Sequence, residues 1–171
     1  MPIVLVTRTY LRMTSRDQLV PARLTDARVR IEAVHDCPAS FFRYLYVEVG
    51  RAYHWVDRLF WSEERWRERL AQAGVVLHLM TCAGAPAGYY ELERHADGSV
   101  EIAYFGVLAE FLRRGLGKHL LTDAVEHAWS LGAASVWLHT CTLDDPAALP
   151  NYERRGFRAF RSETYEVERG D

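Results

Sequence analysis

Apolar and polar side chains alternate with a period of two over residues 28–34, which predicts a β-strand with one buried face. Residues 3–12 are rich in Val, Thr and Tyr, and they predict a second strand. Three further apolar-rich stretches, at 75–82, 87–94 and 99–107, are separated by residues that favour turns. Because short turns join neighbouring strands, these three stretches predict an antiparallel meander.

Apolar side chains spaced by three and four residues predict a helix over residues 115–131, with a glycine after it as a stop signal. Two helices are expected earlier, over 38–50 and over 62–74, and the second has the acidic start that the helix dipole favours. The rest of the chain predicts a strand at 135–141, a helix at 146–155 and two closing strands at 157–160 and 163–167.

The composition indicates a folded protein with one hydrophobic core. Of 171 residues, 49% are hydrophobic and 26% are charged, which excludes intrinsic disorder. No linker or repeat divides the sequence, so we expect a single domain over residues 1–171. Lys and Arg total 21 against 23 Asp and Glu, a net charge of -2. This balance lacks the basic excess of nucleic-acid-binding proteins, so no nucleic-acid partner is expected.

Cys37, Cys82 and Cys141 are odd in number and far apart, without the C-x-x-C spacing typical of zinc and redox sites. We therefore expect free thiols in a reducing compartment and no bound metal. The first residues lack the basic and apolar regions of a signal peptide, and no apolar run is long enough to cross a bilayer. These features predict a cytoplasmic protein with no membrane partner.

The most informative segment is R-R-G-L-G at residues 113–117, between the strand at 99–107 and the helix that follows. Glycines let a backbone approach an anion, and the first N–H groups of a helix have no partner within the helix. The helix dipole adds to the charge of the basic side chains, so the segment predicts a phosphate or pyrophosphate site. Packing of Gly115 against a neighbouring helix is the alternative. The residues expected to hold the anion are Arg113, Arg114, Gly115, Leu116, Gly117 and Lys118.

Two other nucleotide-binding motifs do not fit this segment. The ATP-binding P-loop requires G-x-x-x-x-G-K-[ST], whereas here the glycines stand at other spacings and His119 follows the lysine. The Rossmann motif G-x-G-x-x-G requires a third glycine where this chain has Leu120. Both motifs are therefore excluded.

The segment resembles the acetyl-CoA-binding motif [QR]-x-x-G-x-[GA] of the GNAT superfamily of N-acetyltransferases. Residues 112–117 read L-R-R-G-L-G, so Leu112 replaces the usual Gln or Arg. Residues 151–157, N-Y-E-R-R-G-F, resemble the family's Y-x-x-x-G-F motif, and Asp145 and Ala148 stand where many members have Asn and Ala. Two motifs in the family's order make the resemblance specific, and it extends over about residues 75–167.

The resemblance implies an α/β fold with a mostly antiparallel central sheet, splayed strands and flanking helices. It also implies acetyl-CoA as the cofactor, with its pantetheine arm bound between the splayed strands. The chain would then comprise an N-terminal strand or extension (1–26), an acceptor-side half (27–107) and a CoA-binding half (108–171). The further positions implied to contact the cofactor are Phe105, Gly106, Val107 and Asp145.

Acyl transfer from a thioester to an amine requires a base, a donor to the oxyanion and an acid for the thiolate. Tyr152 is the candidate acid because a phenol is protonated at pH 7, and a core tyrosine is the alternative. Glu101, which is similar in spacing to the strand glutamate of histone-acetylating GNAT members, is one candidate base, and His139 and water are the others. A backbone N–H near residues 105–107 would stabilise the oxyanion.

Aromatic residues crowd the segment 41–66, which in GNAT folds covers the acceptor cleft. They predict either core packing or an apolar acceptor pocket, for which Tyr53, Trp55 and His139 are the candidate contacts. The predicted function is direct transfer of an acetyl group to a primary amine of a small molecule or peptide, with which a homodimer is compatible. The alternatives are a non-catalytic acyl-CoA-binding regulator and a partner-binding module with the same fold.

Overall fold

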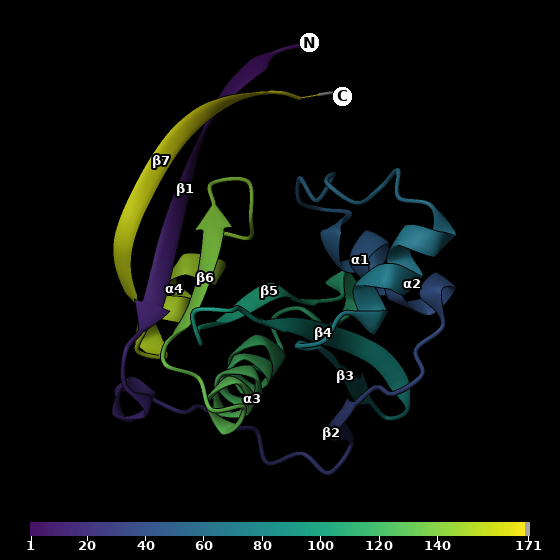
Figure 1. The fold of residues 1–171 in the computed structure, drawn as a ribbon, viewed down its shortest axis with the longest axis vertical. Helices are drawn as coiled ribbons and strands as arrows, with labels where there is room; N and C mark the ends of the chain where they lie inside the picture. Colours follow the sequence, from purple (N-terminus) through teal and green to yellow (C-terminus); the bar gives the residue numbers. More distant parts are fainter. Residues whose placement is uncertain (170–171) are drawn as a thin grey trace.

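Residues 1–169, the part of the chain that the computed structural model describes, form one sheet of seven strands (Figure 1). The strands are β1 (Ile3–Met13), β2 (Val29–Ala33), β3 (Val75–Cys82), β4 (Ala85–Arg94), β5 (Val100–Val107), β6 (Val136–Cys141) and β7 (Arg158–Glu168). Their order in the sheet is β2-β3-β4-β5-β6-β1-β7. Every neighbouring pair is antiparallel except β5 and β6, which run parallel. The predicted mixed and mostly antiparallel α/β fold is confirmed.

Helices cover both faces of this sheet (Figure 1). On one face α1 (Ala39–Gly50) and α2 (Glu63–Ala71) pack against β3, β4 and β5. On the other face α3 (Leu116–Ser130) packs against β4, β5 and β6 and contacts α4 (Ala148–Arg154). Each face has its own hydrophobic core, so the sheet separates two packed layers. Among residues 1–169, every helix is too short or too polar to cross a membrane.

The predicted meander is confirmed, because β3 pairs with β4 and β4 pairs with β5 in antiparallel fashion. The predicted helices form with small shifts at their ends. Ser62 caps α2 by accepting a hydrogen bond from the N–H of Arg65, and the helix ends at Ala71 rather than near residue 74. In α3 the apolar stripe of the sequence is the buried face, as its spacing predicted.

The prediction of two closing strands at 157–160 and 163–167 is wrong, because β7 is continuous. It pairs with β1 along its whole length, and the pairing shifts between Tyr10 and Leu11, so that Phe160 lies opposite no partner. This β-bulge changes the alternation of side chains in the middle of the strand. The alternation of side chains along the sequence is therefore interrupted at a point where the strand itself is continuous.

The position of β1 follows from the tertiary structure alone. It lies between β6 and β7, antiparallel to both, so the first strand of the chain pairs with the last one (Figure 1). Residues Arg8–Met13 pair with β6, whereas β1 residues before Arg8 pair only with β7. Beyond the end of β6, β1 and β7 therefore continue as a two-stranded ribbon. Residues of this ribbon line one side of the cleft described below.

The strands β5 and β6 separate soon after they begin. Their pairing is limited to Val100 with Val136 and Glu101 with Trp137. Beyond this point the β6 side of β5 has no strand partner among the described residues, so its backbone groups face a cleft. Gly106 lies against α1, where a Cβ would overlap the side chain of Val49. The missing side chain of Gly106 thus permits a close approach of α1 to β5.

Candidate active site

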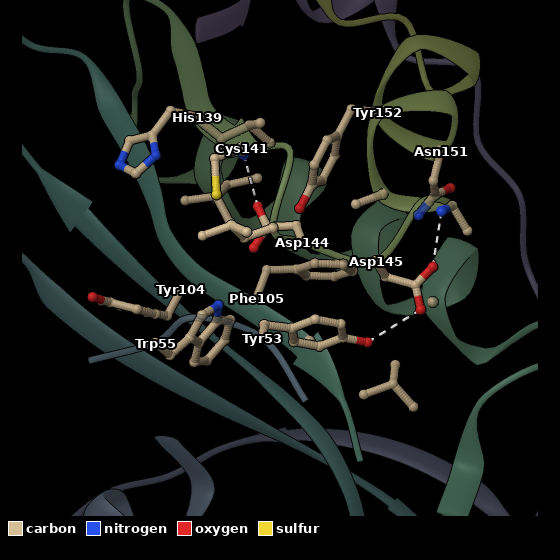
Figure 2. A pocket seen from close by; sticks show the side chains of 18 of the residues that line it. Tyr53, Trp55, Tyr104, Phe105, His139, Cys141, Asp144, Asp145, Asn151 and Tyr152 are labelled. Carbon is tan, nitrogen blue, oxygen red and sulfur yellow. Dashed lines mark hydrogen bonds between the residues drawn. The ribbon is translucent and has the colours of Figure 1, made fainter. Parts of the chain in front are cut away.

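A cleft of about 1690 Å³ opens where β5 and β6 separate. Figure 2 shows part of its lining, with side chains from β5, β6, α4 and the segment after α1 converging on one space. The predicted site residues that line it are Tyr53, Trp55, Glu101, Phe105, Gly106, Val107, Arg113, Gly115, Leu116, Gly117, Lys118, His139, Asp145 and Tyr152. The structure thus brings together residues from both halves of the chain, and Arg114 is the one predicted position outside the lining.

One end of the cleft is formed by the N-terminus of α3. Gly115 precedes the helix with a φ of 75°, in the left-handed region that favours glycine. No side chain among the described residues caps this end, so the N–H groups of the first turn remain available to an anion. Arg113 has a φ of 62°, a conformation that costs a non-glycine residue about 1 kcal/mol or more and is typical of binding segments.

Four cationic side chains line the same end of the cleft: Arg113, Lys118, Arg154 and Arg155. Within residues 1–169, none of them lies within 4.0 Å of a carboxylate oxygen. Arg155 is buried, and its Nε has no hydrogen-bond partner in that part of the chain. Burial and the neighbouring Arg154 lower the pKa of Arg155. A bound anion would relieve this repulsion and supply the missing partner.

The side chain of Arg114 is exposed and does not line the cleft. Its guanidinium lies 5.1 Å from the centroid of the Phe111 ring, a cation–π contact on the surface. Phe111 lines the cleft, so this guanidinium lies next to it, and the expected role of Arg114 in holding phosphate stays a prediction.

Tyr152 lies at the middle of the cleft, on α4. Its ring packs between Phe105 and Phe157, with centroid distances of 6.1 and 6.2 Å. The residue is 7% exposed, and its hydroxyl points into the cleft toward Asp144 (Figure 2). Burial, and then the charge of Asp144, raise the pKa of Tyr152. The phenol therefore stays protonated and can donate a hydrogen bond to a charge that develops nearby.

A hydrogen bond crosses the cleft beside Tyr152. The Tyr53 hydroxyl donates to Oδ2 of Asp145 at 3.1 Å, joining the segment after α1 to the loop before α4 (Figure 2). Asp145 also accepts the N–H of Ala147 at 2.8 Å, which fixes the carboxylate. Burial and the Asp145 charge raise the pKa of Tyr53 to about 12, so this hydroxyl remains a donor at neutral pH.

The other end of the cleft has aromatic walls. Trp55 packs edge-on against Tyr104 of β5, with ring centroids 4.9 Å apart, and Trp61 lines the same region. The predicted aromatic segment thus divides between two roles. Phe42, Tyr46 and Trp66 are buried in the core between α1, α2 and the sheet, whereas Tyr53, Trp55 and Trp61 reach the cleft. Core packing, one of the two alternatives left open by the sequence, is confirmed for the first three residues, and the acceptor pocket stays a prediction for those that line the cleft.

Most of the charges at this aromatic end are paired with each other. Arg58 forms two hydrogen bonds to the buried Glu91, at 2.7 and 2.9 Å. Arg69 bridges Glu91 and Glu93, at 2.7 and 2.8 Å. Glu101 is bound to His95 instead, with 2.9 Å between Oε2 and Nε2. Glu93, His95 and Glu101 each have a side-chain oxygen or nitrogen atom within 4.8 Å of those of the other two, close enough to be possible metal ligands. The ion pairs and hydrogen bonds just described account for this close grouping.

Asp57 is the exposed carboxylate of this end, and it has no ion-pair partner among the described residues. Burial and, in smaller part, the Asp57 charge raise the pKa of Tyr104 on β5 and of Tyr165 on β7. Asp57 thus lines the cleft, and its charge acts on side chains of both β5 and β7. Together with Glu101 it leaves this end negative, whereas the α3 end is positive.

His139 and Cys141 line the cleft from β6. Desolvation by the surrounding atoms, and then the Arg8 guanidinium, lower the pKa of His139, so its imidazole is neutral at pH 7. Burial and the Asp144 carboxylate raise the pKa of the Cys141 thiol. A protonated thiol is a poor nucleophile, so the net effect of these surroundings disfavours Cys141 as a nucleophile.

Sequence reasoning missed several lining residues. Asn151 lies across from Gly117, where a Cβ would meet its Nδ2 at 4.0 Å, and it directly precedes Tyr152 in the second motif. Its position in that motif was the signal from which the sequence could have predicted it as a lining residue. Tyr104 and Asp144 gave none, because strand and loop residues of these types are common outside active sites.

A family model described as the acetyltransferase (GNAT) family matches residues 32–157. A search of curated proteins finds no significant match. Two similar solved structures are GCN5-related N-acetyltransferases. The one from Sphaerobacter thermophilus has 19% identity and a TM-score of 0.72, over 98% of this chain and 53% of that chain. The one from Kribbella flavida has 23% identity and a TM-score of 0.68, over 98% of this chain and 61% of that chain.

The ribosomal-protein-S18-alanine N-acetyltransferase from Escherichia coli is also similar, with 21% identity and a TM-score of 0.58 over 76% of this chain and 77% of that chain. At these identities the structures show a common fold. This chain spans little more than half the length of the first two. The family model covers most of the chain. The matched residues include the separated strands β5 and β6 and the uncapped start of α3, which form the cleft. The chain therefore belongs to the acetyltransferase (GNAT) family.

Proposed function

We propose that this protein transfers the acetyl group of acetyl-CoA directly to a primary amine. The observation that carries the proposal is the division of charge along one cleft. In the described part of the chain, cations without a carboxylate partner and free helix N–H groups lie at one end, and Asp57, without an ion-pair partner, lies with Glu101 at the other. An anionic donor and an amine acceptor would thus enter from opposite ends and meet near Tyr152 and the exposed edge of β5.

The residues at the positive end fit coenzyme A. The first turn of α3 offers N–H groups to a pyrophosphate, and Lys118 and Arg113 add charge beside them. The unpartnered, buried Nε of Arg155 supports a further phosphate contact. Between these groups and Tyr152, the free edge of β5 at Phe105–Val107 offers backbone donors and acceptors to an amide-containing arm. Leu112 lines the cleft without a polar group, so that contact would be apolar.

When bound, acetyl-CoA supplies an activated acyl group and a thiolate leaving group. Glu101 accepts a proton from the acceptor ammonium, which frees the nitrogen lone pair for attack. Backbone N–H groups of residues 105–107 stabilise the negative charge that develops on the acyl oxygen. Tyr152 donates its hydrogen bond to the departing sulfur, and its raised pKa keeps it protonated until then. The protonated Cys141 takes no part.

The acceptor end supports a positively charged amine. Its walls are Trp55, Trp61 and Tyr104, and aromatic faces with a nearby carboxylate attract ammonium groups. Asp57 is placed to hold such a group, and His139 is the alternative base. The printed name of the Escherichia coli structure concerns a protein N-terminal alanine. We therefore include peptide N-termini beside small amines among the acceptors to be tested.

The test combines binding and turnover. Acetyl-CoA is titrated by calorimetry, with dephospho-CoA and ATP as comparison ligands, and thiol release is followed with a panel of small amines and peptides. Lys118→Ala removes a charge that lines the cleft, and Arg114→Ala removes a neighbouring charge that does not. We expect Lys118→Ala to weaken binding about tenfold, the loss of one charge-assisted contact, and Arg114→Ala to leave binding nearly unchanged.

The absence of any heat or thermal stabilisation with acetyl-CoA would refute the proposal. Equal effects of the two variants would refute the assignment of the positive end. Binding without thiol release for any amine would favour the non-catalytic acyl-CoA-binding regulator.

A further inference from the structure

The arginines and glutamates on the acceptor face of the sheet form a network of fixed charges. Arg58 binds both oxygens of Glu91, and Arg69 joins Glu91 to Glu93. Guanidinium groups do not lose their proton at physiological pH. The network therefore sets two guanidinium groups against two carboxyl groups.

Glu101 lies next to this network but is paired differently. It is opposite Glu93 in the pairing of β4 with β5, and its side chain is 14% exposed and lines the cleft. Its partner is the imidazole of His95, at 2.9 Å between Oε2 and Nε2. An ionised carboxylate only accepts hydrogen bonds, so whenever Glu101 is ionised the proton of this hydrogen bond is on Nε2 of His95. Glu101 is thus the carboxylate of the cluster that no arginine holds.

His95 is fixed on the side of Glu101 away from the cleft. It follows β4 and is not part of the cleft lining. Its N–H donates to the carbonyl of Ser99 at 2.9 Å, and its carbonyl accepts the N–H of Gly98 at 3.0 Å, which fixes the turn. Its ring lies 5.7 Å from the Trp137 ring, and its side chain is 34% exposed. The ring therefore connects Glu101 to solvent without entering the acceptor space.

We propose that His95 positions Glu101 as the general base: its Nε2–H holds one carboxylate oxygen, and the second oxygen accepts the proton that leaves the acceptor ammonium. The N–H bond of the ammonium breaks, an O–H bond forms on Glu101, and the nitrogen keeps its electron pair for attack. The hydrogen bond from His95 stabilises the ionised carboxylate in surroundings that disfavour charge. This inference rests on the proposed acetyl transfer.

The other charges that face Glu101 act in opposite directions. Burial raises the pKa of Glu101, the hydrogen bond from His95 lowers it, and Glu93 on β4 raises it while Arg69 on α2 lowers it. Trp137, the neighbour on β6, carries no charge. His95 makes no hydrogen bond to the arginine network, so a single substitution can remove its hydrogen bond to Glu101 and leave the hydrogen bonds of Arg58 and Arg69 in place.

The test uses three variants of the full chain. His95→Leu removes the donor, His95→Gln keeps an N–H donor that does not titrate, and His35→Leu is a control at an exposed histidine outside the cleft. The pKa of Glu101 is measured by carbon-13 NMR of labelled glutamate, with the signal assigned by Glu101→Gln. The pH dependence of kcat/KM is measured for an amine that the wild-type protein acetylates, and the Kd for acetyl-CoA is measured in parallel.

We expect His95→Leu to raise the pKa of Glu101 by about one pH unit and to shift the acidic limb of the kcat/KM profile to higher pH by the same amount. At pH values below that limb, kcat/KM should be about tenfold lower than in the wild-type protein. His95→Gln should recover most of this shift, and the Kd for acetyl-CoA should stay unchanged. An unshifted Glu101 titration in His95→Leu would overturn the inference. If the wild-type protein acetylated no amine, the proposed function would fail, and the NMR titration would still decide whether His95 holds Glu101 ionised.

Discussion

The surroundings of single side chains decide which of the candidate groups are chemically suited to act. Tyr152 is buried between two aromatic rings with its hydroxyl directed into the cleft, and burial keeps it protonated. We expect Tyr152→Phe to lower kcat about a hundredfold, the usual contribution of a general acid, with little change in the Kd for acetyl-CoA. Steady-state kinetics and calorimetry would measure both. An unchanged kcat would return Tyr152 to the role of a core tyrosine.

The surroundings of Cys141, by contrast, make its side chain unsuited to act. It lines the same cleft, but burial and Asp144 raise the pKa of its thiol, which disfavours the nucleophilic thiolate. We therefore expect Cys141→Ala to keep most of the wild-type turnover with an amine acceptor. Mass spectrometry of the wild-type protein with acetyl-CoA alone should find no acetylated cysteine. Loss of turnover with intact CoA binding would contradict direct transfer.

At the scale of elements, the cleft depends on how closely α1 approaches β5. Gly106 allows this approach, since a Cβ there would overlap Val49. We expect Gly106→Ala to lower the free energy of unfolding by about 1–3 kcal/mol, because overpacking displaces the helix from the strand. The double variant Gly106→Ala/Val49→Ala should be more stable than the sum of the two single variants predicts, because the smaller side chain makes room. Urea denaturation of all four proteins measures this coupling, and strict additivity would refute the contact.

At the scale of the whole molecule, a histidine pair joins the sheet to α3. Nε2 of His78 on β3 lies 3.1 Å from Nε2 of His127, and the His78 ring stacks on Tyr90. Burial, and then the two neighbouring histidines His127 and His35, lower the pKa of His78 from 6.5 to about 4. The unfolded chain therefore binds a proton at a higher pH than the folded protein does. The stability from this site is fully present above pH 6.5 and is lost as the pH falls toward 4.

The expected loss is about 3 kcal/mol across this pH range, as an order of magnitude. His78→Phe keeps an aromatic ring on Tyr90 but removes the titration. We expect its unfolding free energy to fall less steeply with pH than that of the wild-type protein when both are measured by urea denaturation from pH 7 to 4.5. Parallel pH dependences would show that His78 does not titrate as its burial implies.

Local patterns in the sequence determined most of the elements and both of the motifs that resemble those of the family. Apolar spacing predicted the meander and α3, because which face of an element is buried is written in its own residues. The glycine and arginine order at 112–117 predicted the helix start at the positive end, since the free N–H groups depend only on where a helix begins. The same local reasoning failed at β7, where a bulge at Phe160 interrupts the pattern within a continuous strand.

The tertiary structure alone decided what depends on contacts between distant segments. It placed β1 between β6 and β7, separated β5 from β6 after two residue pairs, and turned Arg114 onto Phe111. It also gave the buried and half-buried carboxylates at the aromatic end of the cleft their partners, so that Glu101 is held by His95 and Glu91 by Arg58, whereas Asp57 has no ion-pair partner among the described residues. Residue types reveal which groups can ionise. The sequence pattern does not reveal which of these groups remain unpaired and face a cleft. That depends on neighbours in three dimensions, which come from distant parts of the chain.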